Sequence, residues 1–192
     1  MPKVIADMQI FQGVMESIAE RGYAGATTRQ IADAAGVSEV TLFRKYGTKA
    51  ELVKHTIAAL IEQTEFEGAT RYTGDIQADL LRVLEAYQAA VVVHGRFFFA
   101  LFLEASRISE LADSFSQPMG LFQAVGQLLA RYQAEGILKP ENPVHGVASL
   151  LGPFTYLSMI EQSATNVSMA PLDMMVHICY FLEGRAQSQI EK

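Results

Sequence analysis

The sequence of 192 residues contains no tryptophan, six prolines and one cysteine. The single Cys179 excludes an internal disulfide and fits a reducing compartment, although it could serve as a redox sensor. Its apolar neighbours Ile178, Tyr180 and Phe181 favour a buried structural thiol. No uncharged apolar run reaches the length needed to span a bilayer, and the N-terminus lacks a secretory pattern. These absences predict a cytoplasmic protein that makes no contact with a membrane.

The patterns of catalytic and metal sites are missing as well. The four histidines, at positions 55, 94, 145 and 177, do not have the spacing of metal ligands. The sequence also contains no nucleophile elbow, no phosphate-binding loop and no plausible catalytic triad. We therefore predict that the chain is not an enzyme and holds neither a metal nor a cofactor.

Half of the residues are hydrophobic and 19% are charged, and the apolar residues recur with helical periodicity. These properties predict an all-α protein of about nine helices. A glycine within the first helix, Gly13, costs stability unless it permits close packing. Gly22, Gly68, Gly95 and Gly136 are the expected stops. The predicted helices cover residues 4–21, two short stretches between 28 and 46, and then 49–66, 75–94, 96–108, 117–135, 142–162 and 171–183.

The segment from Thr27 to Lys49 predicts two short helices joined by a sharp turn. Thr27 and Gln30 form a capping box that starts the first helix. Gly36 can adopt the positive φ that ends this helix, and Ser38 is a good N-cap for the second. Helical spacing turns Leu42 and Tyr46 inward and leaves a small, polar and mostly basic set outside. This arrangement is that of a helix-turn-helix, whose second helix enters the major groove of DNA.

Thr48 and Glu51 form a second capping box, which places Lys49 in the first turn of the next helix. The helix dipole disfavours a cation there by a few tenths of a kcal/mol. A DNA phosphate at the helix N-terminus would reverse this penalty, so we predict a phosphate contact for Lys49. A solvated surface lysine is the alternative.

The order of these motifs resembles the tetracycline-repressor family of transcription regulators. The resemblance covers roughly residues 10–53, and it implies a DNA-binding domain at residues 1–50 followed by a helical ligand-binding and dimerisation domain at 51–192. The elements that carry it are Gly22-Tyr23, Thr27-Thr28, Ile31-Ala32, Ala35-Gly36-Val37-Ser38, Thr41-Leu42-Phe43, Tyr46 and Thr48-Lys49.

The predicted contacts to double-stranded DNA divide into two groups. Thr28, Phe43, Lys45, Tyr46 and Lys49 would mainly hold the backbone, whereas Arg29, Glu39, Val40, Thr41 and Arg44 would lie nearer base edges, with the caps Thr27 and Ser38 beside them. Phe43 replaces a usual tyrosine and loses its hydroxyl contact to phosphate, which the charge of Lys45 could restore. Glu39 either caps its helix or accepts a hydrogen bond from cytosine N4.

The net charge of −6 is unevenly distributed along the chain. Residues 1–56 carry seven Lys and Arg against six Asp and Glu, whereas residues 57–192 carry eight against fifteen. The excess negative charge therefore lies in residues 57–192, the body of the chain. The electrostatic field around the predicted reading helix can be positive.

The last two long helices carry more apolar surface than one neighbour needs. In proteins that this chain resembles, these helices pair with their symmetry mates, which implies a homodimer on a palindromic site with half-sites about 34 to 36 Å apart. Packing within one chain is the alternative. Pro153 is expected to bend the first of the two helices.

By the same resemblance the middle helices enclose a small, largely apolar effector that releases DNA, as in a repressor. The candidate ligand contacts are Tyr87, His94, Phe98, Phe102, Glu104, Met119, Phe122, Gln123, Phe154 and Tyr156. Each of them also suits the core of a helical bundle, and Glu104, if buried, needs Arg107 or a cationic ligand as partner. A body that docks another protein and binds no effector is the alternative function.

Overall fold

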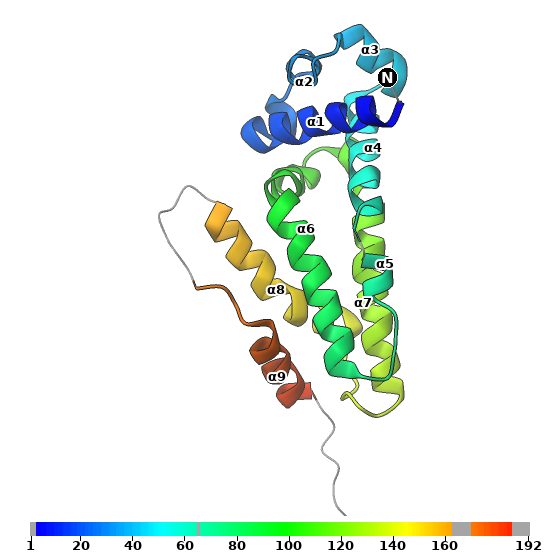
Figure 1. The fold of residues 1–192 in the computed structure, drawn as a ribbon, viewed down its shortest axis with the longest axis vertical. Coiled ribbons are helices and arrows are strands. Elements are labelled where there is room, and N and C mark those ends of the chain that lie inside the picture. The colour runs from blue at the N-terminus through cyan, green and yellow to red at the C-terminus, as the bar shows by residue number, and fades with distance from the viewer. Residues whose placement is uncertain (1–2, 65, 163–169, 186–192) are drawn as a thin grey trace, which may run out of the picture. The chain divides into compact units, whose positions relative to one another are not determined.

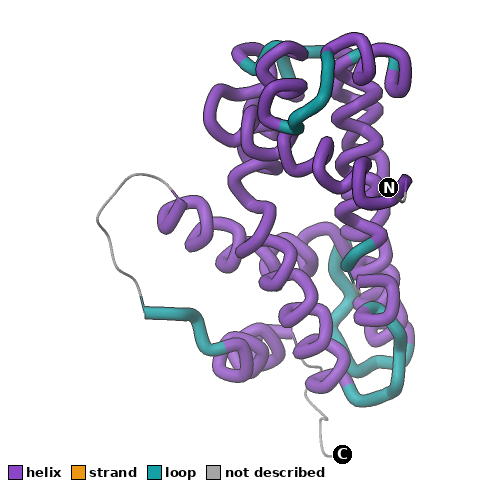
Figure 2. The backbone as a smooth tube through the Cα atoms, turned by 45° about the horizontal axis from the view of Figure 1, so that its top comes forward, coloured by secondary structure: helices purple, strands orange, loops and turns teal. Residues whose placement is uncertain are grey.

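A computed structural model of the chain describes residues 3–64, 66–162 and 170–185. Within these ranges the backbone forms helices and loops and no strand (Figure 2), so the all-α prediction is confirmed. The helices, labelled in Figure 1, are α1 (Lys3–Gly25), α2 (Thr28–Ala34), α3 (Glu39–Tyr46), α4 (Lys49–Glu62), α5 (Phe66–Ala69), α6 (Ile76–Ala105), the 3₁₀ helix η1 (Ser109–Phe115), α7 (Ser116–Ala134), α8 (Pro143–Gln162) and α9 (Met174–Arg185).

The chain folds into two compact units, each with its own hydrophobic core. Unit 1 consists of the described residues up to Gln63 together with His94–Pro118, and unit 2 of the described residues in 64–93 and from Met119 onward. One division between the units follows α4, and another lies within α6. The predicted domains, residues 1–50 and 51–192, have other boundaries than these units, and their division of function stays a prediction.

Unit 1 is built on the first four helices. α1 packs against α2 and α4, and α3 packs against the same two helices (Figure 1). A Cβ added at Gly13 of α1 would lie 2.9 Å from the nitrogen of Ala35, just after α2. This close approach is the packing reason for a glycine that otherwise weakens the helix. The core of the unit includes Val14, Ile18, Ile31, Leu52, Ile57, Phe97, Leu101 and Leu111, all buried.

Two predicted helix ends are wrong. α4 ends at Glu62 instead of about Phe66, because the N–H of Gln63 turns to the carbonyl of Leu60 at 3.2 Å and tightens the last turn. The predicted stop at Gly95 does not occur, and α6 runs through it as one helix of 30 residues. An interior glycine costs about 1 kcal/mol relative to alanine, and buried neighbours such as Phe97 can offset that cost.

By length and composition α6 is the described helix that could cross a membrane, although Arg96 interrupts its apolar stretch, so the prediction that no uncharged apolar run is long enough is not contradicted. Leu80 and Leu84 of this helix are fully buried in the core of unit 2, and Leu101 in the core of unit 1. A helix with its apolar side in a protein core passes the same test of length and composition.

The helices of unit 2 begin and end close to the predicted residues. Pro118 lies in the first turn of α7, Gly136 with φ 72 follows its end, and α8 starts at Pro143. α9 begins at Met174, three residues later than predicted, after the cap Asp173. Cys179 is exposed, so the prediction of a buried thiol is wrong. Apolar residues are spread around the whole circumference of α9, so the sequence does not reveal which of them turn inward.

Candidate nucleic-acid interface

The turn between α2 and α3 has the predicted geometry. The hydroxyl of Thr27 accepts the N–H of Gln30 at 3.2 Å, and the Gln30 side chain accepts the N–H of Thr27 at 2.9 Å. After α2, Gly36 has φ 66, and the N–H of Val37 donates to the carbonyl of Ala32 at 3.0 Å. This bond pattern is a Schellman motif, which satisfies the last carbonyls of α2 and turns the chain sharply.

The start and the buried side of α3 are also as predicted. The hydroxyl of Ser38 accepts the N–H of Thr41 at 3.2 Å and caps the helix. Leu42 and Tyr46 are buried in the core of unit 1. These two anchors fix the rotation of α3 about its axis, so the opposite side of the helix faces solvent.

The outward side of α3 and the adjacent part of α2 carry the predicted DNA contacts. Val40 is 75% exposed and Phe43 is 48% exposed. The other predicted contacts that are exposed or half-exposed are Thr27, Thr28, Arg29, Ser38, Glu39, Thr41, Arg44, Lys45 and Lys49. The fold thus brings residues from positions 27 to 49 onto neighbouring elements, and their contacts to DNA stay predictions.

Glu39 has a partner inside the chain. The hydroxyl of Thr28, the first residue of α2, donates to Oε1 of the Glu39 carboxylate at the start of α3. This bond joins the two helices of the motif, and the carboxylate also lies where the helix dipole favours a negative charge. Bracing the motif is therefore a third role for Glu39, beside the capping and cytosine-reading roles predicted from the sequence.

Lys45 and Tyr46 are tied to α1. Lys45 forms an ion pair with Asp7 and its ammonium lies 5.2 Å from the centre of the Tyr46 ring. The hydroxyl of Tyr46 donates to Asp7 as well, at 3.3 Å, and burial raises the pKa of this tyrosine. A phosphate contact by Lys45 would therefore compete with Asp7.

Lys49 is held by the end of α1. Its ammonium donates to the carbonyls of Tyr23 at 2.7 Å and Ala26 at 3.0 Å, and it lies 4.0 Å from the centre of the Tyr23 ring. Burial lowers the pKa of Lys49, against the charges of Glu110 and Glu104, which raise it. These contacts explain why a cation is tolerated in the first turn of α4, and the phosphate contact stays a prediction.

Two acidic residues far along the chain secure the same segment. Gly22, with φ 70 and ψ 169, interrupts α1, so the next amides lack helical partners. The Glu104 carboxylate accepts the N–H groups of Tyr23 and Ala24, each at 2.8 Å, and Glu110 accepts the Tyr23 hydroxyl at 2.6 Å. Burial and the bond to Glu110 raise the pKa of Tyr23. The partners of Glu104 are therefore backbone amides, which the sequence did not indicate.

The other predicted ligand contacts of unit 1 lie on α6. Burial lowers the pKa of His94. Phe98 is half-buried with its ring 5.4 Å from that of Phe97, whereas Phe102 is exposed and its ring lies 6.3 Å from that of Phe115. His94, Phe98 and Phe102 follow one another at four-residue spacing along α6, and their contacts to a ligand stay predictions.

The ligand contacts predicted in unit 2 include one aromatic cluster. The Tyr87 hydroxyl is hydrogen bonded to that of Thr155 at 2.6 Å, and its ring lies 6.3 Å from that of Phe122. Phe154 is buried with its ring 5.4 Å from that of His177. Met119, Gln123 and Tyr156 are exposed. An open groove of about 580 Å³ is lined by Gly68, Arg71, Tyr72, Thr73 and Arg82, none of them a predicted contact.

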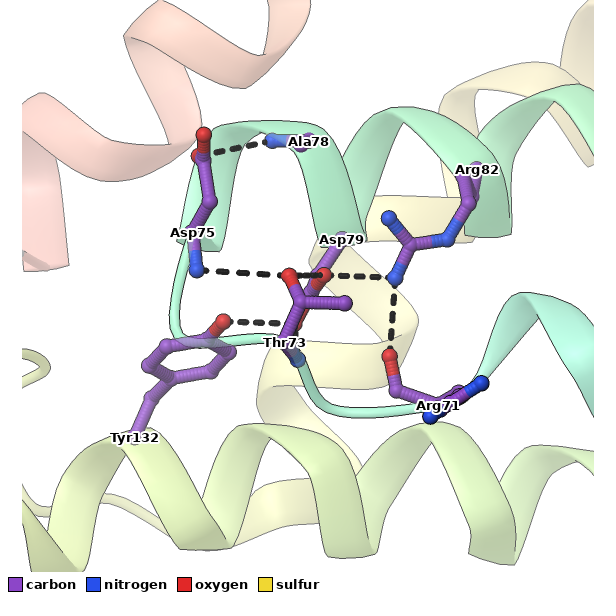
Figure 3. Close-up of polar contacts among 7 residues, drawn as sticks. All are labelled: Arg71, Thr73, Asp75, Ala78, Asp79, Arg82 and Tyr132. Carbon is purple, nitrogen blue, oxygen red and sulfur yellow. Dashed lines mark hydrogen bonds and ion pairs between the residues drawn. The ribbon is translucent and has the colours of Figure 1, made fainter.

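Unit 2 also holds a buried carboxylate that sequence reasoning missed (Figure 3). Asp79 of α6 is fully buried and accepts the N–H of Thr73 at 2.8 Å, the hydroxyl of Tyr132 at 2.6 Å and the guanidinium of Arg82 at 2.5 Å. Burial by itself raises the pKa of Asp79, but the hydrogen bonds outweigh it and hold the pKa below its ordinary value. The cluster ties the loop before α6 to α6 and α7. Its only sequence signal is the spacing of Asp79 and Arg82.

The fold and the motif define a helix-turn-helix protein with an all-α body, and comparisons place it among known proteins. Residues 10–56 match the model of the family described as "Bacterial regulatory proteins, tetR family". An HTH-type transcriptional regulator of Bacillus subtilis is 33% identical over 82 residues, 39% of either chain. One from Mycobacterium tuberculosis is 31% identical over 107 residues, 56% of this chain and 52% of the other. The matches thus span about half or less of these relatives.

Solved structures share the fold over nearly the whole length. A TetR family transcription regulator from Marinobacter aquaeolei superposes with a TM-score of 0.69 at 17% identity, covering 95% of this chain and 96% of the other. For PfmR from Thermus thermophilus the TM-score is 0.67 at 15% identity, with the same coverage. Over residues 10–56 the chain is similar to the tetR family of bacterial regulatory proteins, and solved structures of TetR family regulators share its fold. These relatives are described as transcriptional regulators, which agrees with the prediction that the chain is not an enzyme.

Proposed function

We propose that this chain regulates transcription in the cytoplasm by binding double-stranded DNA, with α3 in the major groove. The observation that carries the proposal is the outward side of α3, which is fixed in rotation by buried Leu42 and Tyr46 and is accompanied by exposed residues of α2. The family match over residues 10–56 supports it. Exposed Arg29 and Arg44 supply positive charge to this surface.

Selection of bound sequences from a random pool of double-stranded DNA tests the proposal with the full chain. We expect one preferred sequence, and affinity that falls steeply with salt. Arg44→Ala should weaken binding to the selected sequence, and Arg107→Ala is the matched control because Arg107 is also exposed in unit 1 but lies outside the motif. Recovery of no preferred sequence, or equal loss in both variants, would contradict the proposal.

We further propose that the chain acts as a homodimer that covers the apolar sides of α8 and α9. Exposed large apolar side chains on these two helices are Val144, Tyr156, Met159, Met175, Val176 and Tyr180. A group of exposed large apolar side chains on neighbouring elements is typical of a protein interface, and a two-fold dimer would read a palindromic site.

Sedimentation analysis tests the dimer. Tyr180 is 68% exposed in the single chain, so Tyr180→Glu should yield a folded monomer, whereas Val93→Glu on α6, at 70% exposure, should leave the dimer intact. Exposed Cys179 offers a second measurement, because it is the only thiol and lies next to Tyr180. A maleimide should label it slowly in the dimer and quickly in the Tyr180→Glu variant. A monomeric parent protein would contradict the proposal.

The effector proposed for the body is a small, largely apolar molecule whose binding favours a state that releases DNA, as in a repressor. The cluster of Tyr87 and Phe122 in unit 2 supports such a ligand. Docking of a protein is the second candidate, because Val92, Val93, Phe102 and Leu103 of α6 expose apolar side chains. Thermal unfolding with a series of apolar probes, from dodecanoate to naphthalene, separates them, since only an effector site predicts stabilisation.

A further inference from the structure

Two large apolar side chains are exposed on α3. Val40 is the second residue of the helix, and Phe43 follows three residues later on the same side. Neither belongs to the core of unit 1. An exposed valine gains no free energy from burial and has a lower helix propensity than alanine. The folded chain by itself therefore gives no reason for apolar residues at these two positions.

The polar groups beside Val40 already have partners within the chain. The Glu39 carboxylate accepts the hydroxyl of Thr28, and the hydroxyls of Ser38 and Thr41 are hydrogen bonded to each other at 2.8 Å. The first turn of a reading helix is the part that meets base edges. In this protein the most exposed group described there is the branched aliphatic side chain of Val40.

Among the four bases, only thymine presents a methyl group in the major groove, and apolar side chains recognise it by direct contact. A valine side chain that packs on this methyl removes both groups from water. Cytosine offers no methyl at the same place, and the purines present ring nitrogens and polar substituents there. An apolar first turn therefore distinguishes thymine from the other bases.

We propose that Val40 determines sequence specificity by packing against the 5-methyl group of a thymine in each half-site, and that the Phe43 ring shields this contact from water. Glu39 then braces the motif through Thr28 and reads no base. The inference rests on the proposed function, because it requires α3 to lie in the major groove.

Replacement of thymine by deoxyuridine tests the inference, because it removes only the methyl group. The preferred sequence is first selected from the random pool. Each thymine of one half-site is then replaced in turn, and the dissociation constant of the full chain is measured by fluorescence anisotropy at fixed salt. We expect one replacement to weaken binding about fourfold, the effect of burying one methylene-sized group, and the others to change it little.

The variant Val40→Ala assigns the methyl contact to its side chain. The variant should fold as the parent does, because position 40 is exposed and alanine favours helix. It should bind the thymine and deoxyuridine sites alike, whereas Val93→Ala, a similarly exposed valine on α6, should retain the fourfold difference. Glu39→Gln should leave the preferred base sequence unchanged.

The outcomes separate the inference from the function on which it rests. If no sequence is preferred, the proposed DNA-binding function itself fails. A preferred sequence without thymine, or one in which no deoxyuridine matters, overturns the inference alone. A methyl effect that persists in Val40→Ala overturns the role of Val40, and a changed base preference in Glu39→Gln overturns the bracing role of Glu39.

Discussion

The clamp formed by Glu104 predicts a specific loss of stability in unit 1. Gly22 interrupts α1, and the next two amide groups find their acceptors in the Glu104 carboxylate, at 2.8 Å from Tyr23 and 2.8 Å from Ala24. Glu104→Ala removes both acceptors. Tyr23 is buried, so its amide would lose its partner without ready access to water, whereas Ala24 is exposed and can be hydrated.

The expected magnitude follows from this difference in exposure. A hydrogen bond to a charged group contributes about 1.5–3 kcal/mol, and water replaces most of the one at Ala24. We therefore expect Glu104→Ala to lower the free energy of unfolding of unit 1 by about 2–3 kcal/mol. Glu104→Gln should lie between the parent and Glu104→Ala, since an amide keeps only one acceptor oxygen.

Urea unfolding followed by circular dichroism measures the loss, because the chain has no tryptophan to serve as a fluorescent reporter. Hydrogen exchange at the amides of Tyr23 and Ala24 localises it, and both should exchange faster in Glu104→Ala. The control is Glu85→Ala, an exposed glutamate of the same helix, which should change stability by less than about 0.5 kcal/mol. Equal stability and equal exchange of the two alanine variants would show that Glu104 does not hold these amides.

Three further predictions follow from other contacts within the two units. Lys49→Ala should weaken binding to all DNA sequences alike and flatten the salt dependence by about one unit; an unchanged slope with lower stability would leave Lys49 a structural role only. Asp79→Asn should cost on the order of 2 kcal/mol at pH 7. Because folding lowers the pKa of Asp79, the parent should lose this advantage in urea titrations as the pH falls below about 4, where the variant should change less. Gly22→Ala should destabilise the protein by about 1–3 kcal/mol, since the backbone at this position favours glycine and an added Cβ would collide with the Glu104 carboxylate. A urea titration that gives the variant the stability of the parent would contradict this prediction.

The local geometry of the motif was predictable because short-range rules determine it. The caps at Thr27 and Ser38 and the positive φ of Gly36 depend on residues within a few positions of one another. Helix continuity was less predictable. Gly95 has the sequence features of a stop, but tertiary packing of α6 decides whether the cost of about 1 kcal/mol ends the helix.

The contacts that secure the motif could not be predicted, because they join residues distant in sequence. Glu104 lies 81 positions from Tyr23, and no periodicity connects a carboxylate on one helix with the broken end of another. For Lys49 the local sequence predicted part of the contact. The unfavourable position of its charge indicated that an acceptor must be near, but did not distinguish the carbonyls of Tyr23 and Ala26 from a DNA phosphate.

The same contacts argue that the reading motif is not a self-sufficient domain of residues 1–50. Phe97, Leu101 and Leu111 are buried in the core that also holds Ile18 and Ile31 of the first two helices. Together with the clamp of Glu104, these side chains join the end of α6 to the segment that leads into α2. α6 itself begins in unit 2, at Ile76. Within unit 1, displacement of the end of α6 must therefore either move the Tyr23 segment with it or break the two charged hydrogen bonds to Glu104.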